Sequence, residues 1–401
     1  MGHKRKNGEG TYGDKEINGK LYKYYRTASG KYIYGKTQSE LTAKIKEYNK
    51  QQKDDEILTN KSSKALTIGE YAHQWLIGKK LYIKPKTYDG YEFTVNVICD
   101  KKFMFGDMQL RSIQKEQVQN FISELAEHYA RNTIIKTRVI LNQIFEDAVD
   151  KEIILRNPVR KTKVPLEENI KKQTKEIVIL EESDIIKFIA EAKCINGDGR
   201  HKPCGRIGEP RYGICSEMAL FILNTGLRAS EAIGLKWKYV DLEKKTIYIK
   251  NATTYIKDRD VNSTKKNKLH DGTPKSKTSI RTIPLSDMAV EILKKRKENR
   301  NSEYVFTTDN GTQLLNSNLD KTINRILING ECDITEIGAH ALRHTFASQL
   351  IAQGVDIQVI SKLLGHSKVS TTYNIYIHLL QKQDEKAIKV LNKGILGLPI
   401  A

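Results

Sequence analysis

The sequence predicts a multidomain protein, mainly α with β: a small N-terminal three-stranded sheet plus a helix, an all-α domain, and a mixed α+β domain. Its 401 residues suffice for two or three domains with cores of their own. Turn signals divide the first part of the chain, helical periodicity dominates the middle, and strands mix with helices from Ile177 onward. From these shifts we expect three domains. A linker too polar to pack separates the second domain from the third. Their ranges are 1–58, 65–160 and 177–401, with the linker at 161–176.

The N-terminal segment is rich in cations and tyrosines. Residues 1–50 hold twelve Lys or Arg against five Asp or Glu, with seven tyrosines interleaved. Turn signals at Asn18-Gly19 and Ser29-Gly30 separate three predicted strands, and a capping box at Thr37-x-x-Glu40 opens a helix. The strands are expected over 11–12, 21–27 and 31–35. Such a sheet can offer cations to phosphates and rings to sugars or bases, which favours DNA binding. The alternative is the ordinary preference of tyrosine for strands on a solvated surface.

The middle of the chain carries helical periodicity. A capping box at Thr67-x-x-Glu70 opens the first helix, whose apolar residues recur on one side, and Asn157-Pro158 closes the last connection. Three further amphipathic helices are expected over 87–97, 117–129 and 132–149.

The C-terminal part mixes both kinds of element. A short apolar strand is expected at Ile177, and helices dominate again after Ser286. Between them we expect helices over 183–192 and 216–224 and strands over 246–250 and 281–285. Residues 384–393 predict a last amphipathic helix, and the tail 395–401 has no charged side chain. We expect this tail to dock on a neighbouring protomer, or else to fold back on its own domain.

The charge balance points to a polyanionic partner. The 68 Lys and Arg exceed the 48 Asp and Glu by 20, an excess that in proteins without membrane spans most often serves nucleic-acid binding. No apolar run has the ~18 residues of a membrane span, and no phosphate-binding glycine loop is present, so membrane insertion and nucleotide hydrolysis are not expected.

Five cysteines, an odd number spread along the chain, argue against a disulfide framework and for free thiols in a reducing cytoplasm. The alternative is a structural metal site with Cys194, His201, Cys204 and Cys215 as ligands. This alternative is weak because the residues lack a paired Cys-x-x-Cys.

Four short motifs carry the residue types of a phosphoryl-transfer site. They are Thr225-Gly226-Leu227-Arg228-Ala229-Ser230-Glu231, Lys275-Ser276-Lys277-Thr278, His340-Ala341-Leu342-Arg343-His344, and Leu364-Gly365-His366 with Tyr376-Ile377-His378 downstream. Together they resemble the tyrosine recombinase family, the integrases of phages and conjugative transposons. The resemblance runs from Leu180-x-x-x-Asp184 to Tyr376, and the helical domain is similar to the family's core-binding domain. The N-terminal unit resembles its arm-binding domains, so nearly the whole chain is covered.

The resemblance and the chemistry assign roles to six residues: Arg228, Lys277, His340, Arg343, His366 and Tyr376. Both arginines can fork N–H donors onto phosphate oxygens and so replace a metal ion electrostatically. His340 and Arg343 are three apart on one helix face, whereas His344 is expected to point elsewhere. His340 is the candidate base, and His366 could donate a hydrogen bond to the phosphate.

The nucleophile is expected to be Tyr376, ten residues after His366, in preference to Tyr373. The family resemblance points to Lys277 on a β-hairpin as the general acid, with Lys275 as the alternative, and to Glu231 as a residue that orients an arginine or packs structurally.

The resemblance implies a site-specific DNA recombinase of a mobile element, active in DNA integration and transposition in the cytoplasm. It would cleave double-stranded DNA through a 3′-phosphotyrosine and a Holliday junction, without ATP, metal or other cofactor. The implied partners are core and arm DNA sites, three further copies of the chain in a tetramer on DNA, an excisionase and a host DNA-bending protein. Two alternatives stay open: a type IB topoisomerase-like enzyme, and a catalytically inert DNA-binding regulator.

Overall fold

The computed structural model describes residues 11–377 except 18–19, 28–29, 47, 49–65, 174–176, 197, 199–206, 208, 261–262, 265 and 273–276. The chain divides into two compact units, Met1–Thr174 and Lys175–Ala401. A further division of the first unit, at residues 58 and 65, stays a prediction. The expected helix at 384–393 and the tail after it lie outside the described residues.

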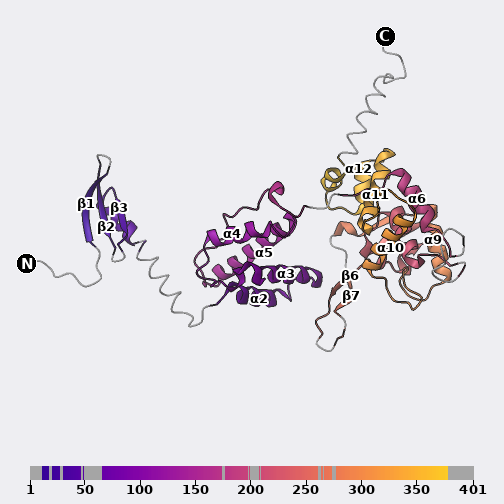
Figure 1. The fold of residues 1–401 in the computed structure, drawn as a ribbon, viewed down its shortest axis with the longest axis horizontal. Coiled ribbons are helices and arrows are strands. Elements are labelled where there is room, and N and C mark those ends of the chain that lie inside the picture. Colours follow the sequence, from indigo (N-terminus) through magenta and orange to yellow (C-terminus); the bar gives the residue numbers. More distant parts are fainter. Residues whose placement is uncertain are drawn as a thin grey trace, which may run out of the picture. The chain divides into compact units, whose positions relative to one another are not determined.

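The N-terminal sheet has three antiparallel strands in the order β1-β2-β3 (Figure 1). They are β1 (Thr11–Ile17), β2 (Lys20–Arg26) and β3 (Tyr32–Gly35). The expected sheet is confirmed, although β1 is longer than predicted because it pairs with β2 as far as Ile17 opposite Lys20. A helical segment over 38–46 follows, and the Thr37 hydroxyl accepts from the N–H of Glu40 at 3.2 Å, as the capping box predicts.

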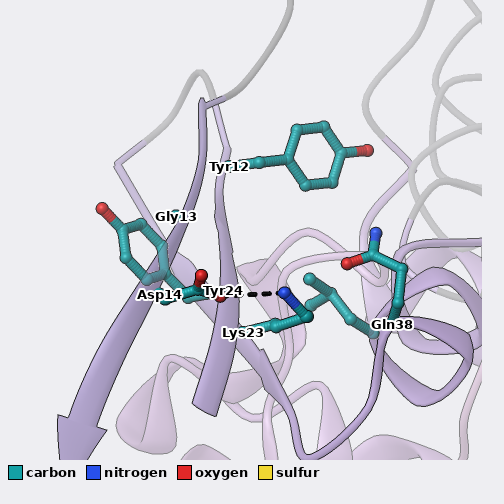
Figure 2. Close-up of a pocket in the computed structure, with 7 residues that line it drawn as sticks. Tyr12, Gly13, Asp14, Lys23, Tyr24 and Gln38 are labelled. Carbon is teal, nitrogen blue, oxygen red and sulfur yellow. Dashed lines mark hydrogen bonds and ion pairs between the residues drawn. The ribbon is translucent and has the colours of Figure 1, made fainter. Parts of the chain in front are cut away.

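A small pocket of about 200 Å³ lies on this sheet (Figure 2). Lys23 forms an ion pair with Asp14 across β1 and β2, with 3.2 Å between Nζ and Oδ1. The ring of Tyr24 covers Gly13, where a Cβ atom would lie only 2.6 Å from the ring, so any larger residue at this point requires the Tyr24 ring to move. The pocket is lined by Tyr12, Gly13, Asp14, Lys23, Tyr24, Gln38 and Leu41.

The helical part of the first unit contains α2 (Ile68–Lys79), α3 (Pro85–Ile98), α4 (Lys115–Leu125) and α5 (Arg131–Asp150). The predicted capping box is present, since Thr67 and Glu70 each accept the other's backbone N–H. Two short 3-10 turns, Lys101–Phe103 and Phe105–Asp107, join α3 to α4. A core of aromatic and aliphatic side chains closes the bundle, with the rings of Phe105 and Phe121 stacked 4.4 Å apart.

The segment after α5 packs more than its composition predicted. Residues 161–176 were expected to be too polar for this, yet the Lys163 N–H donates to the Gln119 side chain at 2.9 Å. The Lys171 N–H donates to the Ala126 carbonyl at 3.1 Å, and Ile170 is buried in the helical core. Backbone groups and one aliphatic residue make these contacts, so counting lysines could not predict them.

The second unit surrounds the buried helix α7 (Gly213–Thr225), against which α9, α10 and α11 pack. Its other helices are α6 (Glu182–Ala192), α8 (Ala229–Ile233), α9 (Asp287–Glu298), α10 (Asn316–Asn329), α11 (Ala339–Ala352) and α12 (Ile357–Leu364). Its strands form one sheet, β4 (Val240–Asp241), β5 (Thr246–Ile249) and β8 (Arg281–Pro284), and one hairpin, β6 (Ala252–Lys257) with β7 (Asn267–Gly272). The hairpin projects from the helical body (Figure 1), and the expected mixed α+β architecture is confirmed.

Two local predictions in this unit were wrong. No strand forms at Ile177; instead the Leu180 N–H donates to the Thr345 hydroxyl at 3.0 Å, which ties this segment to α11. Lys277 was expected on a β-hairpin, but it begins the 3-10 turn Lys277–Ser279, and the strand that follows from Arg281 pairs with Ile249 of β5. The hairpin present is β6–β7, which ends at Gly272, before the lysine segment.

Candidate active site

Two helix ends converge on α11 and expose their carbonyl groups to it. Helix α7 ends at Gly226 and α12 at Gly365, both with left-handed backbone at φ 65° and 68°. A Cβ atom on Gly226 would lie 2.4 Å from the ring of Phe346, so glycine is required there for space as well as conformation. The sequence motifs around both glycines therefore mark tight turns at the site.

Arg343 joins these turns. Only 1% of it is exposed, and its Nη1 and Nη2 groups donate to the carbonyls of Gly226 and Leu364, both at 2.7 Å. Nη2 also lies 3.1 Å from Nε2 of His366. Burial and the nearby charge of Arg228 lower the pKa of Arg343 to about 9, which still leaves it protonated at neutral pH. Arg343 is therefore a fixed cation where the ends of α7 and α12 meet α11.

Glu231 holds two further arginines beside this junction. Its Oε1 lies 2.7 Å from Nη1 of Arg228, and its Oε2 lies 3.0 Å from Nη2 of Arg281. Burial raises the pKa of Glu231, but the hydrogen bond from Arg281 and both arginine charges outweigh it and lower the pKa overall. The Arg228 side chain stays 31% exposed, so it is accessible to a phosphate. Sequence reasoning did not single out Arg281, because its partner lies 50 residues away in the chain.

His366 is held between two partners. Its Nδ1 lies 2.8 Å from the hydroxyl of Thr372, and its Nε2 contacts Arg343. Because arginine has only donors, Nε2 accepts and Nδ1 carries the proton. Burial, with the charges of Arg343 and Arg228, lowers the pKa of His366 to about 4. To donate to a phosphate oxygen, as the sequence suggested, this imidazole must first redistribute its proton.

Tyr376 lies in a helical segment over 369–377 and has no exposed surface, packed with Ile360 and Leu364. Its hydroxyl lies 2.7 Å from Nδ1 of His344. Burial raises the pKa of the Tyr376 phenol, so it is protonated at neutral pH. Tyr373, the alternative nucleophile, is 45% exposed.

The prediction that His344 points elsewhere was wrong. Its ring meets the ring of His340 edge-on at 4.8 Å, and it contacts Tyr376. The two histidines are four apart on α11, a spacing that also shares a helix face, and this signal was overlooked. Burial and the neighbouring His340 and Arg343 lower the pKa of His344 to about 4. His340, the predicted base, keeps an exposed surface while its ring contacts His344. Desolvation on the contacting side and the Arg343 charge lower its pKa as well.

Lys277 starts a short 3-10 turn, Lys277–Ser279, after the hairpin, while Lys275 lies outside the described residues. The end of the hairpin is tied to the body of the unit: the Tyr304 hydroxyl donates to Asp271, and Lys236 Nζ lies 3.5 Å from the same carboxylate. This contact fixes the end of β7 at Asp271.

The four residues of the alternative metal site, Cys194, His201, Cys204 and Cys215, are only partly described. Cys194 is buried with its thiol 3.2 Å from a Glu191 carboxylate oxygen, and burial raises the pKa of Cys215. His201 and Cys204 lie outside the described residues. Within the described ranges, no group of three or more His, Cys, Asp or Glu is arranged to hold a metal ion.

Known proteins are similar to this chain in sequence and fold. The family model "Phage integrase family" matches residues 214–383, and "Phage integrase, N-terminal SAM-like domain" matches residues 67–126. A relative from Caldanaerobacter subterraneus, "Tyrosine recombinase XerC-like", is 30% identical over 397 residues, which cover 94% of this chain and 93% of its own. The chain belongs to the tyrosine recombinase family. The recombinase is therefore an enzyme of DNA recombination, as its motifs led us to expect.

Solved structures share the fold of the recombinase. The Tn1549 transposon integrase, in complex with a circular intermediate DNA, superposes with a TM-score of 0.63 at 19% identity, over 80% of this chain and 99% of the other. A lambda integrase tetramer bound to a Holliday junction superposes with a TM-score of 0.54 at 16% identity, over 88% and 92% of the two chains. In the described part of the recombinase, no helix combines the length and apolarity that crossing a membrane requires.

Proposed function

We propose that this recombinase integrates and excises a mobile DNA element by cutting and rejoining DNA at specific sites. The observation that carries the proposal is the meeting of Arg343, His366 and Arg228 around two helix ends, with Tyr376 bound to the same helix α11 through His344. Three cationic or hydrogen-bonding side chains beside one buried tyrosine suit attack on a phosphodiester. The match to the phage integrase family supports a mobile element as the substrate.

In the proposed reaction, the Tyr376 oxygen forms a bond to phosphorus while the bond from phosphorus to the 5′ oxygen breaks. The product is a 3′-phosphotyrosine and a free 5′ hydroxyl, and the reverse attack by another 5′ hydroxyl rejoins the strands. Arg228 and Arg343 neutralise the non-bridging oxygens, where charge develops. Because Tyr376 has no exposed surface, side chains that cover it must move before a phosphate can reach it.

The reaction also needs an acid for the leaving 5′ oxygen and a base for the phenol. The leaving 5′ oxygen takes a proton from Lys277, or from Lys275, at the end of the tethered hairpin. The phenol loses its proton to a base, for which His340 is the candidate that the sequence proposes. Because the bond energy is kept in the phosphotyrosine, the scheme needs no ATP, and Arg228 and Arg343 supply the positive charge that a metal ion would otherwise provide.

We also infer the assembly from family membership. Four copies would exchange strands between two duplexes through a Holliday junction, as a tetramer is bound to one in the lambda integrase structure. The basic N-terminal sheet would bind arm sites while the helical domain and catalytic unit bind core sites. An excisionase and a host DNA-bending protein are expected partners, and since the substrate is DNA, the cytoplasm is the expected location.

The test is incubation with a nicked suicide duplex that carries the DNA adjoining the gene, because recombination sites commonly lie there. A recombinase becomes covalently attached to the DNA in the presence of EDTA and without ATP. Attachment to this duplex but not to a scrambled one supports the proposal. An absence of attachment despite tight binding would indicate an inert regulator, and sequence-independent attachment with relaxation of supercoiled DNA would indicate a topoisomerase.

A further inference from the structure

His344 is the one described residue whose side chain is hydrogen-bonded to the proposed nucleophilic oxygen, with 2.7 Å between Nδ1 and the Tyr376 hydroxyl. The contact joins α11, which also carries His340 and Arg343, to the segment that carries the nucleophile. Both side chains are buried, so water does not compete for the bond. It is therefore a strong determinant of where the phenol lies.

The direction of this hydrogen bond follows from the chemistry of the two groups. The phenol is protonated, and an imidazole nitrogen is a better acceptor than a phenolic oxygen, so the hydroxyl donates to Nδ1. A donating hydroxyl keeps both oxygen lone pairs free. These are the electrons that must attack phosphorus.

Nothing else described in the cluster provides this acceptor. Arg343 has only donors, and they are directed at the carbonyls of Gly226 and Leu364 and at His366. Without His344 the buried phenol would have an unsatisfied donor and would rotate to find a partner. A displacement of about 1 Å at a nucleophile can slow a reaction ~10²-fold.

We propose that His344 is the positioning residue of the nucleophile: its Nδ1 accepts the Tyr376 hydroxyl and holds the phenol oxygen, lone pairs free, beside the arginine cluster. The inference rests on the proposed function, since it assumes that Tyr376 attacks DNA. It differs from a role as general base: His344 holds the phenol before attack, and as the oxygen bonds to phosphorus the proton leaves this hydrogen bond for the proposed base, His340.

Three substitutions separate these roles. His344→Asn places an amide at the position of Nδ1, where its oxygen accepts the same hydrogen bond but cannot take the proton. His344→Gln places its amide at the position of Nε2, one atom farther out. His344→Leu keeps an apolar side chain in the buried site and removes every acceptor.

The measurement is the single-turnover rate of covalent attachment to the nicked duplex at saturating protein, with wild type and Tyr376→Phe in the same series. Thermal unfolding and DNA affinity identify variants that fail to fold or bind. If His344→Gln and His344→Leu fail in this way, the rate of His344→Asn is compared with that of wild type alone. We expect His344→Asn to react within ~3-fold of wild type, and His344→Gln and His344→Leu to react ~10–10²-fold more slowly with unchanged affinity.

The other outcomes overturn the inference in distinct ways. An equal loss in His344→Asn and His344→Leu, with both folded, would mean that His344 takes the proton. Wild-type rates in all three would mean that the contact has no role, and faster rates would mean that it restrains the nucleophile. If wild type forms no adduct, or Tyr376→Phe still forms one, the proposed function itself fails, whatever the His344 variants do.

Discussion

The N-terminal sheet and the catalytic cluster use the same residue types in opposite settings. On the sheet, Tyr12 and Tyr32 are 55% and 44% exposed, and the Arg26 guanidinium lies over the Tyr32 ring, 5.5 Å from its centre. In the cluster, Tyr376 and Arg343 are buried and their polar atoms are hydrogen-bonded. Exposed cations and rings suit binding that depends on charge and salt, whereas burial fixes geometry and shifts pKa values. Substitutions should therefore change affinity in the first region and chemistry or folding in the second.

The largest effect is expected at Arg343. Arg343→Gln leaves the carbonyls of Gly226 and Leu364 without their charged donor, so the free energy of unfolding should fall by about 2–5 kcal/mol and DNA attachment should be lost. Arg228→Gln is the matched control: its side chain is partly exposed, and Glu231 keeps Arg281. We expect it to lose attachment at nearly unchanged stability. Equal stability of both variants in urea unfolding would break the contrast.

The next largest effect is expected on the attachment rate when Lys277, the proposed general acid, is replaced. Lys277→Ala should slow attachment to an ordinary phosphodiester by the ~10²–10⁴ that a lost general acid costs. A 5′-bridging phosphorothioate has a leaving group that needs no proton, so the variant should cleave it at nearly the wild-type rate. Single-turnover rates on the two substrates check this. Equal defects on both would transfer the role to Lys275 or to another residue.

The buried histidines predict how stability depends on pH. The pKa of His344 is about 4 in the folded protein, against an ordinary value of about 6.5, because it is buried and lies near His340 and Arg343. Between these values the unfolded chain binds more protons, so stability present at pH 7 is lost as pH falls toward 4. His344→Asn should reduce that loss by up to about 3 kcal/mol. Superimposable profiles of unfolding free energy against pH would show that burial does not set this pKa.

The smallest effect is expected on the sheet. Arg26→Gln should weaken binding to arm DNA modestly and flatten the slope of log K against log[salt] by about 0.9, the value for one phosphate contact.

Deleting residues 1–60 should abolish arm binding and leave cleavage of core DNA. Salt titrations of both variants measure the slopes. Unchanged slopes would mean that the exposed tyrosines and cations are an ordinary solvated surface.

Local signals predicted much of the fold. The capping boxes at Thr37 and Thr67 and the apolar periodicity placed the helices of the first unit to within a few residues, because these signals depend on neighbours in the chain. Contacts between distant segments were not predictable in this way. The pairing of Arg281 with Glu231 and the packing of Ile170 depend on the tertiary fold.

In the candidate site, too, local motifs predicted the residues, whereas contacts between distant segments were not predictable. Arg228, Arg343, His366 and Tyr376 were chosen from motifs, and the first three meet around the two glycine turns. The role of His344 was missed because the segment at 369–377 reaches α11 only in the folded unit. The four-residue spacing from His340 could have given the direction of His344, but not its partner.

The central claim is that the buried tyrosine, and not the exposed one three residues earlier, attacks DNA. Tyr376→Phe removes one oxygen from a buried site, and Tyr373→Phe removes one from the surface, so the pair is matched in chemistry. Covalent attachment to the nicked suicide duplex, with the modified peptide identified by mass spectrometry, compares them directly. The account predicts that Tyr376→Phe binds DNA and forms no adduct, while Tyr373→Phe forms adduct at the wild-type rate. An adduct on Tyr373, or one formed by Tyr376→Phe, would contradict it.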